Sequence, residues 1–321
     1  MVNSNDILDF SIDNNFLRPE VNISCNSLDI SSYHLSDKLY DDISSLYGVK
    51  SNQIELYDRQ SSAIFSIFTI LKIRLINIYS PCSNQYKNIA SKLNYTIELI
   101  NRFTDLNKDI SSKSIVIFTN PSVPDGSFYD IDILMKKWIE KKCTIIVDES
   151  FLDFTSYESV SKYIDIYDNI YIINSISKFY THYDVKICSV ISSSTNIAKL
   201  KSSELLYDIS QFDSLYIQEI VKDKTFKKIS KAINIGNKEI LIKTLEDSKY
   251  ISAVFSSSTN FVLIQLQSID SKSFQELLKP YNIMVKECSE FDFLDDSFIR
   301  ISVNSKKNIK KLQTILQKIE V

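Results

Sequence analysis

Residues 144–154 read TIIVDESFLDF, a short apolar and β-branched run that ends on two carboxylates, Asp148 and Glu149. A run of this kind predicts a buried strand. In an open α/β sheet, ligands bind outside the carboxyl ends of the strands, so acidic residues at this position are candidates for chemistry. Two other interpretations of Asp148 and Glu149 compete with this one. One is an acidic pair without function, and the other is the acidic strand end of an ATPase.

The segments on both sides of this stretch repeat the pattern of strand and helix. Residues 114–119 (SIVIFT) predict a buried strand, and residues 131–142 predict a helix with Leu134, Trp138 and Ile139 on one face. Further strands are expected at 144–147, 170–174 and 187–192, the last being antiparallel or at an edge. Strands that alternate with helices predict an α/β fold with a mostly parallel central sheet.

The end of the chain has a different organisation. Residues 196–248 have an almost entirely helical pattern. Strands are then expected at 260–266, 283–288 and 298–303, and helices at 273–278 and 307–319. This β-α-β-β-α order predicts a small α+β domain, joined to the large one by a long helix.

The composition excludes several classes of function. The net charge of −3 argues against nucleic acid as the main partner. Only three glycines are present, so the glycine-rich loops that bind dinucleotides or nucleoside triphosphates cannot be built, and the ATPase interpretation fails. Five scattered cysteines and only two histidines argue against a metal site and favour reduced thiols in the cytoplasm. No apolar stretch predicts a membrane span, and the first residues do not resemble a secretory signal.

A lysine and an aspartate are expected at neighbouring strand ends. Asp148 ends one strand, and Lys178 follows the next one with Ser175 and Ser177 beside it. A lysine placed there can form a Schiff base with an aldehyde, while the hydroxyl groups and nearby amides hold a phosphate. A facing aspartate keeps a pyridine nitrogen protonated, which makes the ring an electron sink. These groups together are what pyridoxal phosphate requires.

Several segments, read in order, resemble the fold-type I pyridoxal-phosphate enzymes of aminotransferase class I/II. They are NPSVPDG (120–126), TIIVDESFLDF (144–154), NSISKFYTHYDVKIC (174–188) and FIRISV (298–303), together with ILDFSIDNN (7–15), LYDDISSLYGVKSNQIEL (39–56) and TNFVLIQL (259–266). Within this family the chain is most similar to the branch of histidinol-phosphate aminotransferase and threonine-phosphate decarboxylase. The segment IMVKECSEFDFL (283–294) is closer to the decarboxylase pattern.

The resemblance implies a role for each matching residue. Lys178 corresponds to the Schiff-base lysine, Asp148 to the partner of the pyridine nitrogen, and Arg300 to the group that grips the substrate carboxylate. The implied cofactor-binding residues are Ser175, Ser177 and Lys186 at the phosphate, Tyr33 reaching across a dimer interface, Gln60 and Ser61 in a backbone turn, and Asn120.

The sequence also departs from the family pattern at several of these positions. Val123 and Phe151 stand where the family has groups that donate hydrogen bonds to the phenolic oxygen of the cofactor. Lys186 replaces an arginine and lacks its bidentate fork. Asp58 and Arg59 replace the usual Asn-Gly turn, and Ser83 stands where an aromatic residue normally stacks on the ring, with Tyr86 nearby. These departures predict weaker cofactor binding.

The resemblance implies a homodimer with a large domain at 30–220 and a small domain made of 1–29 with 221–321. The function expected is that of a pyridoxal-phosphate-dependent aminotransferase whose small-molecule substrate is an amino acid, with a phosphorylated amino acid as the narrower option. Phospho-amino-acid decarboxylation stays open, because sequence does not show which bond at the α-carbon aligns with the ring. A catalytically impaired binding or regulatory protein of the same fold is the alternative from another class.

Overall fold

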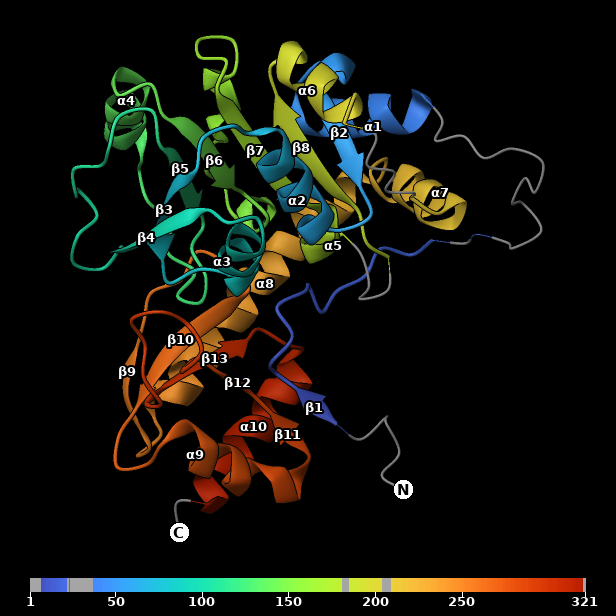
Figure 1. The fold of residues 1–321 in the computed structure, drawn as a ribbon. Helices are drawn as coiled ribbons and strands as arrows, with labels where there is room; N and C mark the ends of the chain where they lie inside the picture. Colours follow the sequence, from blue (N-terminus) through green and yellow to red (C-terminus); the bar gives the residue numbers. More distant parts are fainter. Residues whose placement is uncertain (1–6, 22, 24–36, 181–184, 204–208, 320–321) are drawn as a thin grey trace.

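A seven-stranded sheet forms the larger part of the molecule (Figure 1). The computed structural model describes residues 7–21, 23, 37–180, 185–203 and 209–319. In sheet order the strands are β2 (Ile54–Tyr57), β8 (Cys188–Ser192), β7 (Ile170–Ser175), β6 (Thr144–Asp148), β5 (Ile115–Thr119), β3 (Leu75–Ser80) and β4 (Thr96–Asn101). The last five are mutually parallel, and β8 is antiparallel to both of its neighbours. The predicted α/β fold class is confirmed, and so is the antiparallel direction of the strand at 187–192.

The central strands are apolar because both of their faces are covered. Every residue of β5 and β6 is buried, as expected for parallel strands between two layers of helices. Side chains alternate between the layers: Val116 and Phe118 pack on one face, Ile115 and Ile117 on the other. The first face is covered by α1 (Asp37–Tyr47), α4 (Asp132–Glu140) and α7 (Gln211–Ile220), and the second by α2 (Gln60–Ile70), α3 (Asn84–Lys92) and α6 (Ser194–Lys201).

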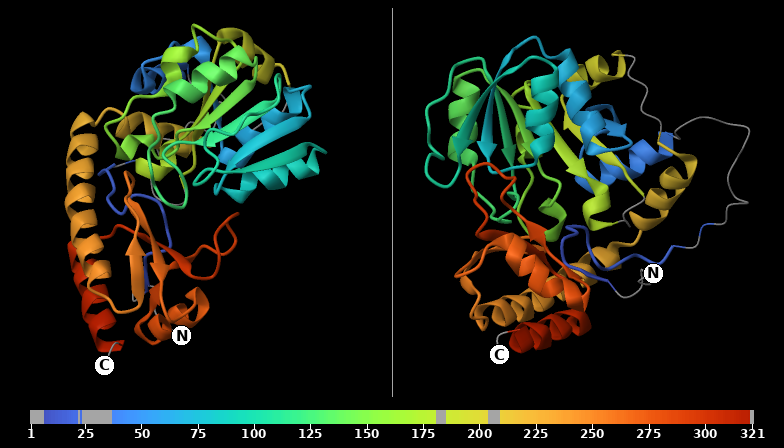
Figure 2. Two further views of the ribbon diagram at one scale, coloured as in Figure 1. Left: turned by 90° about the vertical axis from the view of Figure 1, so that its left-hand side faces the viewer. Right: turned by 60° about the horizontal axis from the view of Figure 1, so that its bottom comes forward.

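A second, antiparallel sheet forms the smaller part. Its order is β12 (Lys286–Glu287), β13 (Phe298–Ser302), β10 (Phe261–Leu266) and β9 (Ile251–Val254). Its apolar core includes residues of α8 (Lys224–Glu246), α9 (Ser271–Leu278) and α10 (Lys306–Ile319). Figure 2 shows the long α8 running from the first part to the second. The N-terminal segment joins here, since β1 (Leu8–Asp9) pairs with β11 (Ile283–Met284).

The second sheet differs from the sequence prediction in two details. The strand expected at 283–288 is interrupted at Val285, whose N–H donates to the Gln275 side chain at 2.9 Å, so β11 pairs with β1 and β12 with β13. The short β9 was not predicted, because its four residues stand beside serine-rich sequence that carries no strand pattern.

Two loops connect the parts around the carboxyl ends of the parallel strands. Gly126 has a φ of +74°, and its carbonyl accepts a 2.7 Å hydrogen bond from the Ser258 N–H of the β9–β10 connection. The loop before β13 reaches α3, where Asp292 forms an ion pair with Lys87 and the Asn84 amide donates to the Glu290 carbonyl at 3.1 Å. The two sheets are therefore held together by two separate sets of contacts at this edge.

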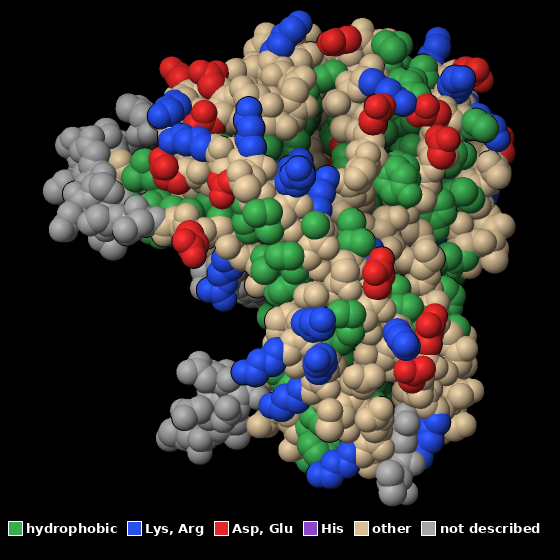
Figure 3. Space-filling model, turned by 180° about the vertical axis from the view of Figure 1, so that it is seen from behind, with side chains coloured by type: hydrophobic (Ala, Val, Ile, Leu, Met, Phe, Trp, Pro, Cys, Tyr) green, Lys and Arg blue, Asp and Glu red, His purple; other side chains and the backbone are tan. Residues whose placement is uncertain are grey.

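The surface shown in Figure 3 mixes basic and acidic side chains over both parts of the molecule. None of the helices in the described ranges combines the length and the apolar character needed to cross a membrane.

Candidate active site

Parallel strands bring the predicted lysine and aspartate to one edge of the sheet. Asp148 is the last residue of β6, and its register partner on β7 is Ile173. The chain leaves β7 at Ser175 and forms the single helical turn α5 (Ile176–Phe179), which carries Lys178. Because β6 and β7 run in the same direction, both groups lie at their carboxyl ends, as predicted.

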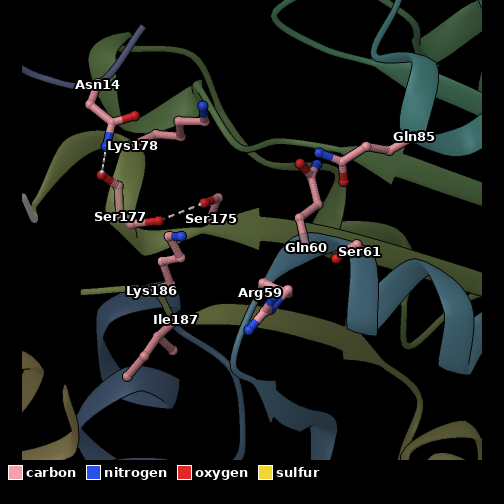
Figure 4. Close-up of a pocket in the computed structure, with 10 residues that line it drawn as sticks. All are labelled: Asn14, Arg59, Gln60, Ser61, Gln85, Ser175, Ser177, Lys178, Lys186 and Ile187. Atoms are coloured by element: carbon pink, nitrogen blue, oxygen red, sulfur yellow. Dashed lines mark hydrogen bonds between the residues drawn. The ribbon is translucent and has the colours of Figure 1, made fainter. Parts of the chain in front are cut away.

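Two adjoining cavities occupy this edge. The first, of about 290 Å³, is lined by Asn14, Arg59, Gln60, Ser61, Gln85, Ser175, Ser177, Lys178, Lys186 and Ile187 (Figure 4). The second, of about 310 Å³, is lined by both parts of the molecule and includes Asp13, Ser83, Val123, Asp148, Ser150, Phe151, Phe291 and Arg300. Gln60, Gln85 and Lys178 line both cavities. One continuous site therefore reaches from the serine-rich end to the buried carboxylate.

The first cavity has the character of an anion site. Ser175 and Ser177 place their hydroxyl oxygens 3.1 Å apart, and the Lys186 side chain points toward them in Figure 4. Ser61 lies in the first turn of α2, whose N-terminus is a favourable place for a phosphate. The Asp58 carboxylate does not line the cavity, because it accepts hydrogen bonds from Arg59 at 2.6 Å and Ser62 at 2.5 Å.

Asp148 is buried and surrounded by hydrogen-bond donors. Its Oδ2 accepts from Gln60 Nε2 at 2.6 Å and from the Tyr86 hydroxyl at 2.8 Å. Its Oδ1 accepts from the N–H of Ser150 at 3.1 Å and from the Ser150 hydroxyl at 2.6 Å. Burial raises the pKa of Asp148, and these donors act in the opposite direction.

Lys178 and Arg300 share a carboxylate that the sequence analysis did not single out. Asp13 Oδ1 lies 2.5 Å from Lys178 Nζ, and its Oδ2 lies 3.1 Å from Arg300 Nη1. The ammonium group of Lys178 also lies 5.4 Å from the centre of the Phe151 ring. Burial acts to raise the pKa of Asp13, but the charges of Lys178 and Arg300 outweigh it and hold the pKa well below its usual range.

The remaining predicted residues have different surroundings. Asn120 is buried, and its side chain exchanges two 2.9 Å hydrogen bonds with the backbone of Tyr129; it does not line either cavity. Tyr33 lies outside the described residues. Val123 and Phe151 form apolar walls of the second cavity, as their family positions imply.

Sequence reasoning missed Asp13, Ser150 and Gln85 as members of the site. Asp13 belongs to a segment that carries the family resemblance, but it meets Lys178 from 165 residues away, and no local pattern reports such a contact. Glu149 is a further buried carboxyl beside the site, and burial raises its pKa to about 7.

The residues present fit pyridoxal phosphate. The cofactor needs an amine for its aldehyde, a carboxylate for its ring nitrogen, and hydroxyl and cationic groups for its phosphate. Lys178 lies between a cavity rich in serines and a cavity that contains the buried Asp148. The donor set therefore has the required chemistry in the required order.

Comparison with known proteins identifies the family. The sequence profile of aminotransferase class I and II matches residues 30–319. The chain is 28% identical over 97% of its length to the adenosylcobalamin biosynthesis bifunctional protein CobDQ of Leptospira interrogans, of which it covers 38%. It is 26% identical over 73% of its length to histidinol-phosphate aminotransferase of Francisella philomiragia and covers 64% of that protein. The chain thus spans less than two thirds of these curated relatives.

Solved structures share the fold over nearly all of the chain. Histidinol-phosphate aminotransferase from Clostridium acetobutylicum superposes with a TM-score of 0.85 at 24% identity, covering 98% of this chain and 99% of that one. L-threonine-O-3-phosphate decarboxylase from Porphyromonas gingivalis gives 0.84 at 17% identity, with coverages of 97% and 99%. Pyridoxal phosphate is the cofactor of the matched family. The chain belongs to the aminotransferase class I and II family.

Proposed function

We propose that this protein is a pyridoxal-phosphate-dependent aminotransferase, similar to histidinol-phosphate aminotransferase, that transfers the amino group of a small, phosphorylated amine or amino acid. The observation that carries the proposal is that Lys178, Asp148 and Arg300 line one cavity at the carboxyl ends of the parallel strands. When bound, pyridoxal phosphate withdraws electrons from the α-carbon of an amine, so that a bond to that carbon can break heterolytically.

Each residue has a distinct task in this proposal. Lys178 Nζ is the amine that holds the cofactor aldehyde and afterwards moves a proton at the α-carbon of the substrate. The Asp148 carboxylate holds a proton on the ring nitrogen, and Tyr86 and Ser150 keep that carboxylate oriented. The hydroxyl groups of Ser61, Ser175 and Ser177, with the ammonium group of Lys186, bind the phosphate.

Cofactor binding is tested on the purified protein by its absorbance. After incubation with pyridoxal phosphate and removal of the free cofactor, the protein should keep a visible band, and borohydride should fix one cofactor to the peptide that contains Lys178. Lys178→Ala should abolish both signals. Lys162→Ala, which removes a half-exposed lysine paired with Asp132 far from the cavities, should leave both unchanged. A wild-type protein that keeps no visible band after incubation with excess cofactor and removal of the free cofactor contradicts the proposal.

Decarboxylation of a phosphorylated amino acid is the second candidate, favoured by the likeness of the fold to the decarboxylase and by the residues at 283–294. The two reactions are separated by their products. Histidinol phosphate with 2-oxoglutarate yields glutamate in a transamination, whereas phosphothreonine or phosphoserine releases CO₂ in a decarboxylation. Release of CO₂ without glutamate would replace the first candidate by the second.

The alternative of another class is a binding or regulatory protein that has lost catalysis. It is supported by Val123 and Phe151, whose side chains offer no hydrogen bond to the cofactor, and by the occupied oxygens of Asp148. A cofactor that binds without any turnover of the substrates above would support this alternative.

The proposal includes a homodimer, a cytoplasmic location and the division of the chain into 30–220 and 1–29 with 221–321. The pairing of β1 with β11 supports the assignment of the N-terminal segment to the smaller domain. The four described cysteines are buried free thiols, which supports a reducing compartment. Sedimentation of the purified chain tests the dimer.

A further inference from the structure

Asp13 occupies the place between the two cationic groups of the site. One of its oxygens contacts Lys178 Nζ at 2.5 Å and the other contacts Arg300 Nη1 at 3.1 Å. Its side chain is 20% exposed and lines the same cavity as Asp148. The protein thus supplies its own carboxylate to the arginine expected to receive one from a substrate.

The backbone around Asp13 is fixed on both sides. The Asn15 N–H donates to the Lys178 carbonyl at 2.8 Å, and the side chains of Asn14 and Asn15 donate to the Ser177 and Phe179 carbonyls at 3.1 and 3.0 Å. The Asn260 amide donates to the Asp13 carbonyl at 2.9 Å. These bonds tie the segment to α5 and to β10, so Asp13 is a built part of the site and not the tip of a loose terminus.

Two further nitrogen atoms of Arg300 are also engaged or buried. Its Nη2 donates to the Ser11 carbonyl at 2.8 Å, and its Nε is buried without a hydrogen-bond partner among the described residues. A bidentate grip on a carboxylate uses two parallel N–H groups of the guanidinium. One N–H of Nη1 is engaged by Asp13 and one of Nη2 by Ser11, so a substrate carboxylate could use only the N–H groups that remain, directly beside the Asp13 carboxylate.

The charges at this point disfavour a second carboxylate. Asp13 is ionised, because the two cations more than offset the effect of its burial. A substrate carboxylate at Arg300 would lie beside the Asp13 carboxylate, and like charges in a partly buried site repel strongly. A neutral substituent, such as a hydroxymethyl group or hydrogen, meets no such repulsion.

We propose that Asp13 determines the substrate specificity of this site by taking the place of a substrate carboxylate at Arg300, so that the preferred amines carry a neutral group where amino acids carry a carboxylate. This inference rests on the proposed function. It makes Asp13 a specificity-determining residue, and it predicts that amino alcohols and simple amines with a phosphate are bound better than the corresponding amino acids.

The test compares two ligands that differ only in the carboxylate, O-phosphoethanolamine and O-phospho-L-serine. Their dissociation constants are measured on cofactor-loaded protein by absorbance titration and by calorimetry. The wild-type protein should bind phosphoethanolamine at least tenfold more tightly. The isosteric, neutral variant Asp13→Asn should shift the ratio of the two constants toward phosphoserine by at least tenfold.

Asp9→Asn is the matched control. It removes a carboxylate from the same segment, one that accepts hydrogen bonds only from Ser11 within the described residues and does not line the cavities. The control should keep the wild-type ratio. A loaded wild-type protein that binds both ligands equally overturns the inference, whatever the behaviour of the variants, and so does an unchanged ratio in folded, loaded Asp13→Asn. A wild-type protein that takes up no cofactor overturns the proposed function and this inference together.

Discussion

At the scale of single residues, the oxygens of Asp148 are shared by several donors. Gln60 and Tyr86 donate to Oδ2 while Ser150 donates twice to Oδ1, which gives the carboxylate four hydrogen bonds. A carboxylate has about four lone-pair sites, so a protonated ring nitrogen must take the place of one donor. Gln60 is the donor that lines both cavities, and its amide is therefore the one in the path of the ring.

Gln60→Ala should therefore strengthen cofactor binding. A hydrogen bond to a charged group contributes about 1.5 kcal/mol or more. The variant loses the bond from Gln60 to Asp148, which stabilises only the cofactor-free site, so the dissociation constant of pyridoxal phosphate should fall by roughly tenfold. Absorbance titration measures the constant. Gln85→Ala, at the same cavities without a described bond to Asp148, is the control and should change it little; weaker binding by Gln60→Ala contradicts this interpretation.

The pH dependence of stability should report Glu149. Its ordinary pKa is 4.5, and burial raises it to about 7 in the folded protein. Between these values the folded state keeps a proton that the unfolded state has released, so stability falls as the pH rises. Glu149→Gln removes this effect, and its stability relative to wild type should increase by about 3 kcal/mol between pH 4.5 and 8. Urea unfolding at several pH values measures the difference, with the exposed Glu246→Gln as control; a difference that stays constant or shrinks refutes the assignment.

At the scale of elements, the loop at 120–127 contacts the smaller part of the molecule at Gly126, whose carbonyl accepts the hydrogen bond from Ser258. A Cβ on Gly126 would lie 2.2 Å from Ser257 Oγ and 2.6 Å from Thr259 Oγ1, in addition to the positive φ. Gly48 also has a positive φ, +66°, but a Cβ there would meet nothing within 4 Å. A comparison of substitutions at the two positions therefore separates the free-energy cost of the positive φ from the cost of steric contact with the β9–β10 connection.

Gly126→Ala should destabilise the protein by about 3 kcal/mol, the sum of left-handed strain and overpacking. Gly48→Ala should cost about 1 kcal/mol, because only the strain applies. Denaturant unfolding of both variants checks the difference. Equal losses would show that the serine and threonine side chains move aside without cost.

The elements that could be predicted from sequence are those with a continuous local pattern. The residues of β5, β6 and β7 are mostly apolar because helices cover both faces of the sheet. These apolar runs predict where the strands lie, and hence that Asp148 ends one strand and that Lys178 follows the next. Asp13 and Gln60 could not be assigned their contacts in the same way. Their partners lie 165 and 88 residues away, and only tertiary packing brings them together.

At the scale of the whole molecule, the site belongs to both sheets. Lys178 and Asp148 come from the first part, whereas Arg300 comes from β13 and Asp13 from the N-terminal segment. A ligand that fills the second cavity contacts residues of both parts. Its binding free energy should therefore stabilise them together.

Hydrogen exchange should show this coupling. Pyridoxal phosphate at about 100 times its dissociation constant stabilises the folded state by about 2.7 kcal/mol. We expect slower amide exchange in peptides from 7–21 and 259–303 as well as in those from 144–178. Lys178→Ala, which cannot hold the cofactor covalently, is the control and should show little change. Protection confined to 144–178 would mean that the two parts respond independently.

The loop before β13 contains a non-glycine residue with a positive φ. Phe293 has a φ of +67°, a conformation that costs a residue with a side chain about 1–2 kcal/mol, and it lies between the contacts of Asp292 and Glu290 with α3 and the start of β13. The folded state therefore carries this backbone cost in the same loop that joins the smaller part to α3, and the ion pair of Asp292 with Lys87 and the hydrogen bond from Asn84 act against it.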